Sequence, residues 1–152
     1  MKLILALAMI CATGLTGVVL ADEPATDFIL SAFPSPTTAE QLARRAELVT
    51  ILDKIGAIPD DEINDYPIVT DPMRVAVGKK MVLSPNYCEI ARTDAANLGL
   101  QTIQAQLANS FILTLAEGIQ GTGINPETED VVPTQEMILA YKNAQRFLDC
   151  AF

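Results

Sequence analysis

Two cysteines, Cys88 and Cys150, limit the folds open to this chain more than any other feature of its sequence. The third cysteine, Cys11, lies in an N-terminal segment that we expect to be removed. In an oxidising compartment the remaining pair is expected to bond, and we predict the disulfide Cys88–Cys150. This bond joins positions 62 residues apart and would stabilise the fold by about 4 kcal/mol. Two free thiols, one of them bridging to another molecule, are the alternative, whereas the spacing excludes a C-x-x-C redox site.

The N-terminus has the three-part pattern of a secretory signal. Lys2 precedes an apolar run over residues 3–20, and Ala21 offers the small side chain that a signal peptidase needs. We predict that residues 1–21 are a signal peptide and that residues 22–152 form a single helical domain. An uncleaved membrane anchor is the alternative, because the run is near the lower length limit for crossing a bilayer. The predicted location is periplasmic or secreted, with no permanent membrane span after cleavage.

The charge of the mature chain favours some partners over others. Removing the leader leaves nine Lys and Arg residues against nineteen Asp and Glu residues, a net charge of −10 without a histidine. A chain this acidic is not expected to bind nucleic acid. The predicted partner is another protein with a basic surface, because opposite charge accelerates association.

Apolar periodicity predicts an all-α fold, a small bundle of about four helices pinned by the disulfide. The only segment that favours a strand, residues 66–70, contains a proline, which disrupts strand pairing. The expected helical segments cover residues 37–56, 72–82, 85–120 and 134–152.

Local start signals support three of these helices. Thr38 and Gln41 have the spacing of a capping box. Asp71 and Ser84 each precede a proline, which is the arrangement of a capping side chain before a first helical residue.

The faces of the expected helices follow from the same periodicity. Arg44 and Arg45 are expected on the outer face of the first helix, and Gly99 permits a bend in the third. The third and last helices must run antiparallel for the two cysteines to meet. The buried stripe of the first helix is expected at Leu42, Ala46, Val49 and Leu52.

The side chains available for chemistry are few. Without histidine the chain lacks the usual general base and the commonest transition-metal ligand, and it contains no P-loop or dinucleotide fingerprint. Glu89 and Asp94 are five positions apart and do not share a helix face. We therefore predict no catalysis and no cofactor, with a carboxylate-based enzyme as a remaining alternative.

The acidic segment at residues 60–65 is the one candidate metal site. Asp60, Asp61, Glu62 and Asp65 offer the oxygen ligands that calcium prefers. The segment lacks the glycine and the spaced glutamate of an EF-hand loop. A solvated acidic loop is the simpler interpretation, and a calcium-dependent module stays an alternative.

An apolar ligand in the bundle core is the other binding hypothesis. Such a carrier would need the two longest helices to be held apart around a cavity. The residues expected to line it are Leu100, Ile103, Leu107, Phe111 and Tyr141. Ordinary core packing is the competing interpretation, because an apolar stripe must be buried in either case.

Taken together, these features predict an exported, non-catalytic protein-interaction protein, such as an inhibitor, an immunity-type factor, a chaperone or an adaptor. Acidity, a rigidifying disulfide and the lack of catalytic side chains support this hypothesis. Arg74, Lys79 and Lys80 form the one basic cluster. They stabilise the end of a helix or form part of the interface with the partner.

Overall fold

The structure, a computed structural model, describes residues 24–150 and 152, and this part of the chain is all-helical, as predicted. The predicted signal peptide, residues 1–21, lies outside the described residues. None of the helices within residues 24–150 is long and apolar enough to span a bilayer. The elements are α2 (Pro24–Leu30), α3 (Ala39–Gly56), the 3₁₀ helix η1 (Asp60–Asp65), α4 (Pro72–Val82), α5 (Tyr87–Leu98), α6 (Leu100–Thr122) and α7 (Gln135–Asp149).

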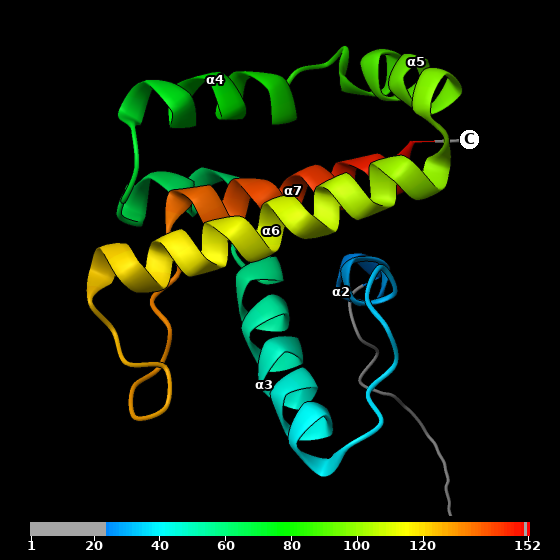
Figure 1. Cartoon of the computed structure of the whole chain (residues 1–152). Coiled ribbons are helices and arrows are strands. Elements are labelled where there is room, and N and C mark those ends of the chain that lie inside the picture. The colour runs from blue at the N-terminus through cyan, green and yellow to red at the C-terminus, as the bar shows by residue number, and fades with distance from the viewer. Residues whose placement is uncertain (1–23, 151) are drawn as a thin grey trace, which may run out of the picture.

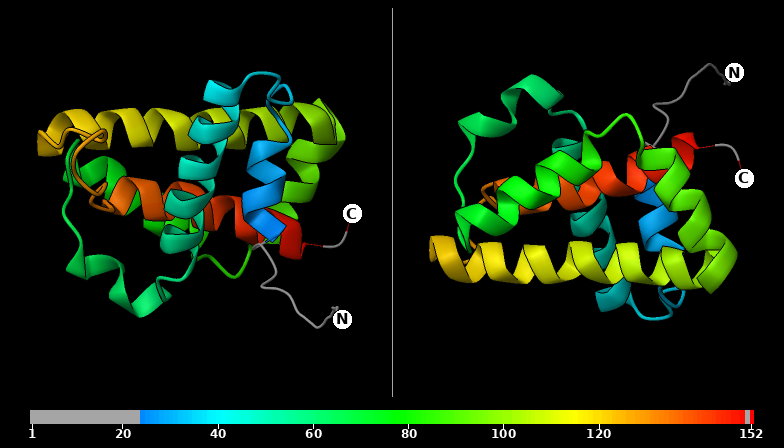
Figure 2. Two further views of the ribbon diagram at one scale, coloured as in Figure 1. Left: turned by 90° about the horizontal axis from the view of Figure 1, so that it is seen from below. Right: turned by 90° about the horizontal axis from the view of Figure 1, so that it is seen from above.

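The helices form three layers (Figure 1). The antiparallel pair α6 and α7 lies in the middle, with α4 and α5 on one side and α2 and α3 on the other (Figure 2). Helix α7 is the centre of the fold, because it packs against every other described helix: α2, α3, η1, α4, α5 and α6. Its side chains are buried around almost its whole circumference from Gln135 to Tyr141.

The core has two parts along α7. In the larger part, Phe111 of α6 meets Tyr141 of α7 edge to face, with 6.4 Å between ring centroids, and both residues are fully buried. The smaller part surrounds Phe147 near the end of α7 and includes Tyr87 of α5 and Leu107 of α6. The two parts together leave α7 with little exposed surface.

The predicted disulfide Cys88–Cys150 is confirmed, with 5.4 Å between the two Cα atoms. It joins the first turn of α5 to the residue that ends α7. The antiparallel arrangement expected from it holds for α6 and α7 (Figure 1).

The expected number of about four helices is not matched, and the single helix over residues 85–120 is one reason. Gly99 has φ +90° and ψ 150°, a conformation essentially restricted to glycine. It ends α5 and starts α6, so α5 folds back over the central layer (Figure 2). Two short helices, α2 and η1, account for the rest of the difference.

Two of the predicted helix caps are confirmed. Thr38 and Gln41 form the predicted capping box of α3, and the Asp71 side chain accepts a hydrogen bond from the backbone N–H of Met73. The Ser84 side chain accepts one from Asn86, but α5 begins only at Tyr87.

The predicted stripe of α3 is wrong at its N-terminal end. Leu52 is buried, whereas the Leu42 side chain is 56% exposed and Ala46 is also exposed. The first half of α3 projects beyond the central layer (Figure 1), so a regular apolar stripe there has nothing to pack against.

Candidate functional site

Polar side chains of α7 hold three connecting segments in place. Glu136 Oε2 accepts hydrogen bonds from the backbone N–H groups of Val69 and Thr70 and from the Thr70 hydroxyl. Lys142 Nζ donates to the Ile58 carbonyl oxygen over 2.7 Å and lies 2.9 Å from Asp60 Oδ1. These buried charges therefore satisfy loop backbone groups.

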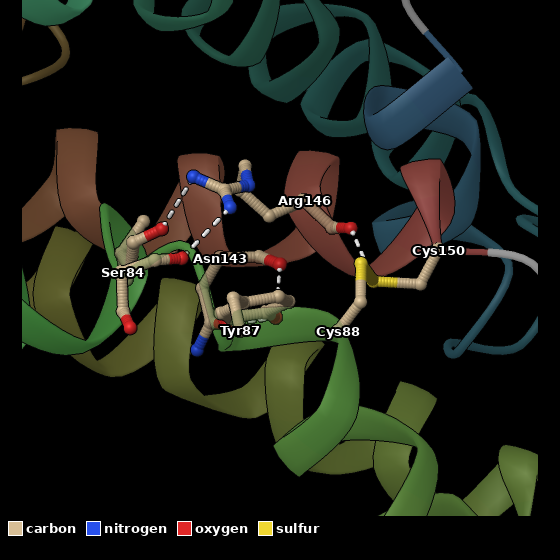
Figure 3. The surroundings of a disulfide bond; sticks show 7 residues. Ser84, Tyr87, Cys88, Asn143, Arg146 and Cys150 are labelled. Carbon is tan, nitrogen blue, oxygen red and sulfur yellow. Dashed lines mark hydrogen bonds between the residues drawn. A yellow bond between two sulfur atoms is a disulfide. The ribbon is translucent and has the colours of Figure 1, made fainter.

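The same arrangement recurs beside the disulfide (Figure 3). The Arg146 guanidinium donates to the carbonyl oxygens of Val82 and Ser84 over 2.8 and 3.1 Å. It also lies over the ring of Tyr87, 5.2 Å from the centroid, and the Tyr87 hydroxyl donates to the Asn143 carbonyl oxygen. Burial raises the pKa of Tyr87 to about 12 despite the nearby Arg146 charge, so this phenol stays protonated and acts as a structural donor.

Glu136 is the most unusual of these groups. Burial alone would raise the pKa of its carboxyl, but the hydrogen bonds from Thr70, Val69 and its own N–H hold the pKa below the ordinary value. The carboxylate is therefore charged at neutral pH while the residue is only 6% exposed. Its Oε1 atom has no hydrogen-bond partner among the described residues.

The acidic segment considered for calcium forms η1. Its first carboxylate, that of Asp60, faces the Lys142 ammonium. Asp61, Glu62 and Asp65 are exposed, and residues 24–150 contain no group of three acidic or thiol side chains placed to hold a metal ion. The arrangement is that of a short acidic helix tied to α7.

The five residues expected to line a core cavity lie in different surroundings within the part of the chain that the structure describes. Leu100 is 52% exposed at the α5–α6 corner. Ile103 and Leu107 border a hollow of about 150 Å³ beside the disulfide. Phe111 and Tyr141 pack directly against each other in the larger core, so the space between them is filled by their own rings.

A groove runs along α7 between α4 and α6, and we call it the α4 groove. It consists of the 150 Å³ hollow and a second one of about 160 Å³, and Met81 and Asn143 border both. Glu136 lines the second hollow, and Ser110 and Thr114 contribute from α6.

The exposed face of α4 beside this groove is apolar. Met73, Val77 and Met81 follow one another at intervals of four residues on α4 and are 70%, 63% and 44% exposed. We call these three residues the α4 stripe. Ile90 of α5, 52% exposed, lies at the end of the groove. This stripe was not predicted from the sequence, although the i, i+4, i+8 spacing of Met73, Val77 and Met81 in an expected helix is visible there.

A second hollow site lies on the opposite side of the molecule, where the chain turns from α2 into α3. We call it the corner pocket. Its volume is about 410 Å³, and it is bordered by Leu30, Phe33, Pro34, Ser35, Pro36, Gln41, Arg44, Arg45, Leu48 and Ile112. Of the two arginines expected on the outer face of α3, Arg44 is exposed and Arg45 is half-buried.

Comparison with known proteins gives no family to which these sites can be referred: no protein-family description, no curated protein and no solved structure matches this chain.

Proposed function

We propose that this is an exported, non-catalytic protein-interaction protein whose partner docks on the α4 stripe. The observation that carries the proposal is the exposure of Met73, Val77 and Met81 on one helix face beside a groove. Methionine is common on surfaces that adapt to a partner, because its flexible thioether fills irregular shapes. A contiguous apolar patch on an exposed helix is a frequent mark of an interface.

The α4 groove also contains a buried polar group, the Glu136 carboxylate. Glu136 is ionised, buried and short of one hydrogen bond among the described residues. A lysine side chain that enters the groove from the partner would supply a donor and an opposite charge. This contact would receive a single basic side chain of the partner, whereas α4 itself carries the cations Arg74, Lys79 and Lys80.

The other hypotheses have less support. The central rings of Phe111 and Tyr141 fill the region where a carrier would hold its ligand. Glu136, Lys142 and Arg146 of α7 bond to backbone groups of other segments, which leaves a carboxylate enzyme without an evident acid–base pair. An inhibitor, an immunity-type factor, a chaperone and an adaptor would each need a docking surface of this kind, so the surface does not distinguish these four roles.

The proposed location outside the cytoplasm is tested by the mass of the protein recovered from the producing cells. Cleavage after Ala21 should remove residues 1–21, and a Cys88–Cys150 bond should lower the mass by two hydrogens. A full-length or reduced protein would contradict export.

The docking proposal is tested with a photo-crosslinking amino acid at Val77. The protein captured there in the producing cells should bind the purified chain with 1:1 stoichiometry. Val77→Asp should weaken that binding by about thirtyfold, as expected for a central apolar anchor.

Leu42→Asp is the matched control, because Leu42 is similarly exposed at 56% but lies on α3, on the other side of the central layer. It should leave the affinity unchanged. Equal losses in both variants, or no loss in Val77→Asp, would overturn the assignment of the α4 stripe as the interface.

A further inference from the structure

The corner pocket has an apolar interior. It lies between the C-terminal end of α2, the segment at residues 31–38, the projecting half of α3, and α6 (Figure 1). Phe33, Leu48 and Ile112 are half-buried and present carbon atoms from three different segments. Pro34 and Pro36 stiffen the segment that forms one wall. The volume of about 410 Å³ lies in the range of small-molecule sites.

One charged side chain in this wall has no protein partner among the described residues. Arg45 is half-buried, and it makes no hydrogen bond or ion pair with any of the described residues. Its neighbour Arg44 pairs with Glu40 over 3.2 Å, and both of those side chains are largely exposed. Elsewhere, the partly buried Arg146 donates to two carbonyl oxygens. Because the Arg45 guanidinium has no protein partner and borders an apolar hollow, it is available to pair with an anionic group bound there.

We infer that the corner pocket binds an amphipathic carboxylate, a small molecule with one carboxylate and an apolar tail. The Arg45 guanidinium receives the carboxylate, because its planar fork of N–H groups matches two carboxylate oxygens. The tail lies against Phe33, Leu48 and Ile112. The site is separate from the α4 groove and does not depend on the proposed protein partner.

The experiment titrates the purified protein with decanoate, decanol and acetate by calorimetry. Decanoate should bind with one molecule per chain. Decanol lacks the charge and acetate lacks the tail, so each should bind at least about tenfold more weakly. Equal binding of decanoate and decanol would overturn the role of the guanidinium, and failure of decanoate to bind would overturn the site.

Two variants separate the specific contact from general attraction. Arg45→Gln should weaken decanoate binding by about tenfold and leave decanol binding unchanged. Lys80→Gln removes the same charge from exposed α4 and should have no effect. An equal loss in both variants would show that net charge alone governs the affinity.

A measurement on the unaltered protein guards against a folding defect in the variants. The methyl NMR signals of Leu48 and Ile112 should shift with decanoate, while those of Val77 on α4 should not. A shift confined to α4 would place the ligand in the groove and overturn the assignment to the corner pocket.

Discussion

Glu136 shows what a single buried carboxylate does in this fold. Its Oε2 atom accepts three hydrogen bonds from residues 69 and 70, and these bonds keep the pKa below its ordinary value against the opposing effect of burial. A group with a lowered folded-state pKa adds stability above its unfolded pKa and loses that contribution as the pH falls through the folded-state value.

Glu136→Gln should therefore lower the free energy of unfolding at pH 7 by about 1–3 kcal/mol, because amide donors and acceptors cannot replace the charged acceptor. The difference between the two proteins should shrink as the pH falls below the ordinary glutamate pKa of 4.5. Urea unfolding across this range measures it.

Glu127→Gln is the control for this prediction, because Glu127 is exposed in the connection between α6 and α7. It should change the free energy of unfolding little at any pH. If the loss of unfolding free energy in Glu136→Gln were equally large at low pH, the contribution of Glu136 would depend on its shape and not on its charge.

At the scale of an element, Gly99 decides how the long apolar segment after Pro85 is divided. Gly99 has φ +90°, and no atom lies within 4 Å of a Cβ added there. A larger residue at this position would therefore be disfavoured by the backbone conformation and not by a steric clash. Gly99→Ala should lower the free energy of unfolding by about 1–3 kcal/mol, as measured by thermal or urea unfolding.

Gly78 of α4 offers a matched comparison. A Cβ added there would meet Leu139 Cδ1 at 3.6 Å, an ordinary contact, and the residue is helical. Gly78→Ala should be neutral or stabilise the protein by up to about 1 kcal/mol. Equal effects of the two substitutions would contradict a conformational role for Gly99.

These elements also show what local sequence can predict. The capping box at Thr38 and Gln41 depends on residues three positions apart, and the disulfide depends on a count of two cysteines. Both were predicted correctly. The failures involve distant neighbours: Leu42 is exposed because α3 projects past its packing partners, and periodicity within a helix carries no information on where those partners end.

The candidate sites also differ in whether they depend on residues of one helix or on residues that are distant in the sequence. Of the five residues expected to line a core cavity, Phe111 and Tyr141 pack edge to face, whereas Ile103 and Leu107 border a separate hollow. The α4 stripe could have been read from its spacing, whereas the corner pocket is assembled from α2, α3 and α6. No pattern within one helix indicates a site of that kind.

For the whole molecule, the disulfide is the covalent link between the outer layer and the centre. Replacing both cysteines with alanine should lower the free energy of unfolding by about 4 kcal/mol, because the bond closes a long loop of the unfolded chain. Urea unfolding of Cys88→Ala/Cys150→Ala against the oxidised protein measures this effect. A deficit below about 1 kcal/mol would show that the unfolded chain is already compact around these residues.

The position of α7 in the chain has a consequence for biosynthesis. The helix that packs against all six others and anchors three connecting segments is also the last of the described helices to be made. Residues 24–134 therefore leave the ribosome before the surface they pack against exists. If the chain is exported as we propose, this order would keep the core open while the chain is threaded through a membrane pore, because the core closes only when α7 has crossed.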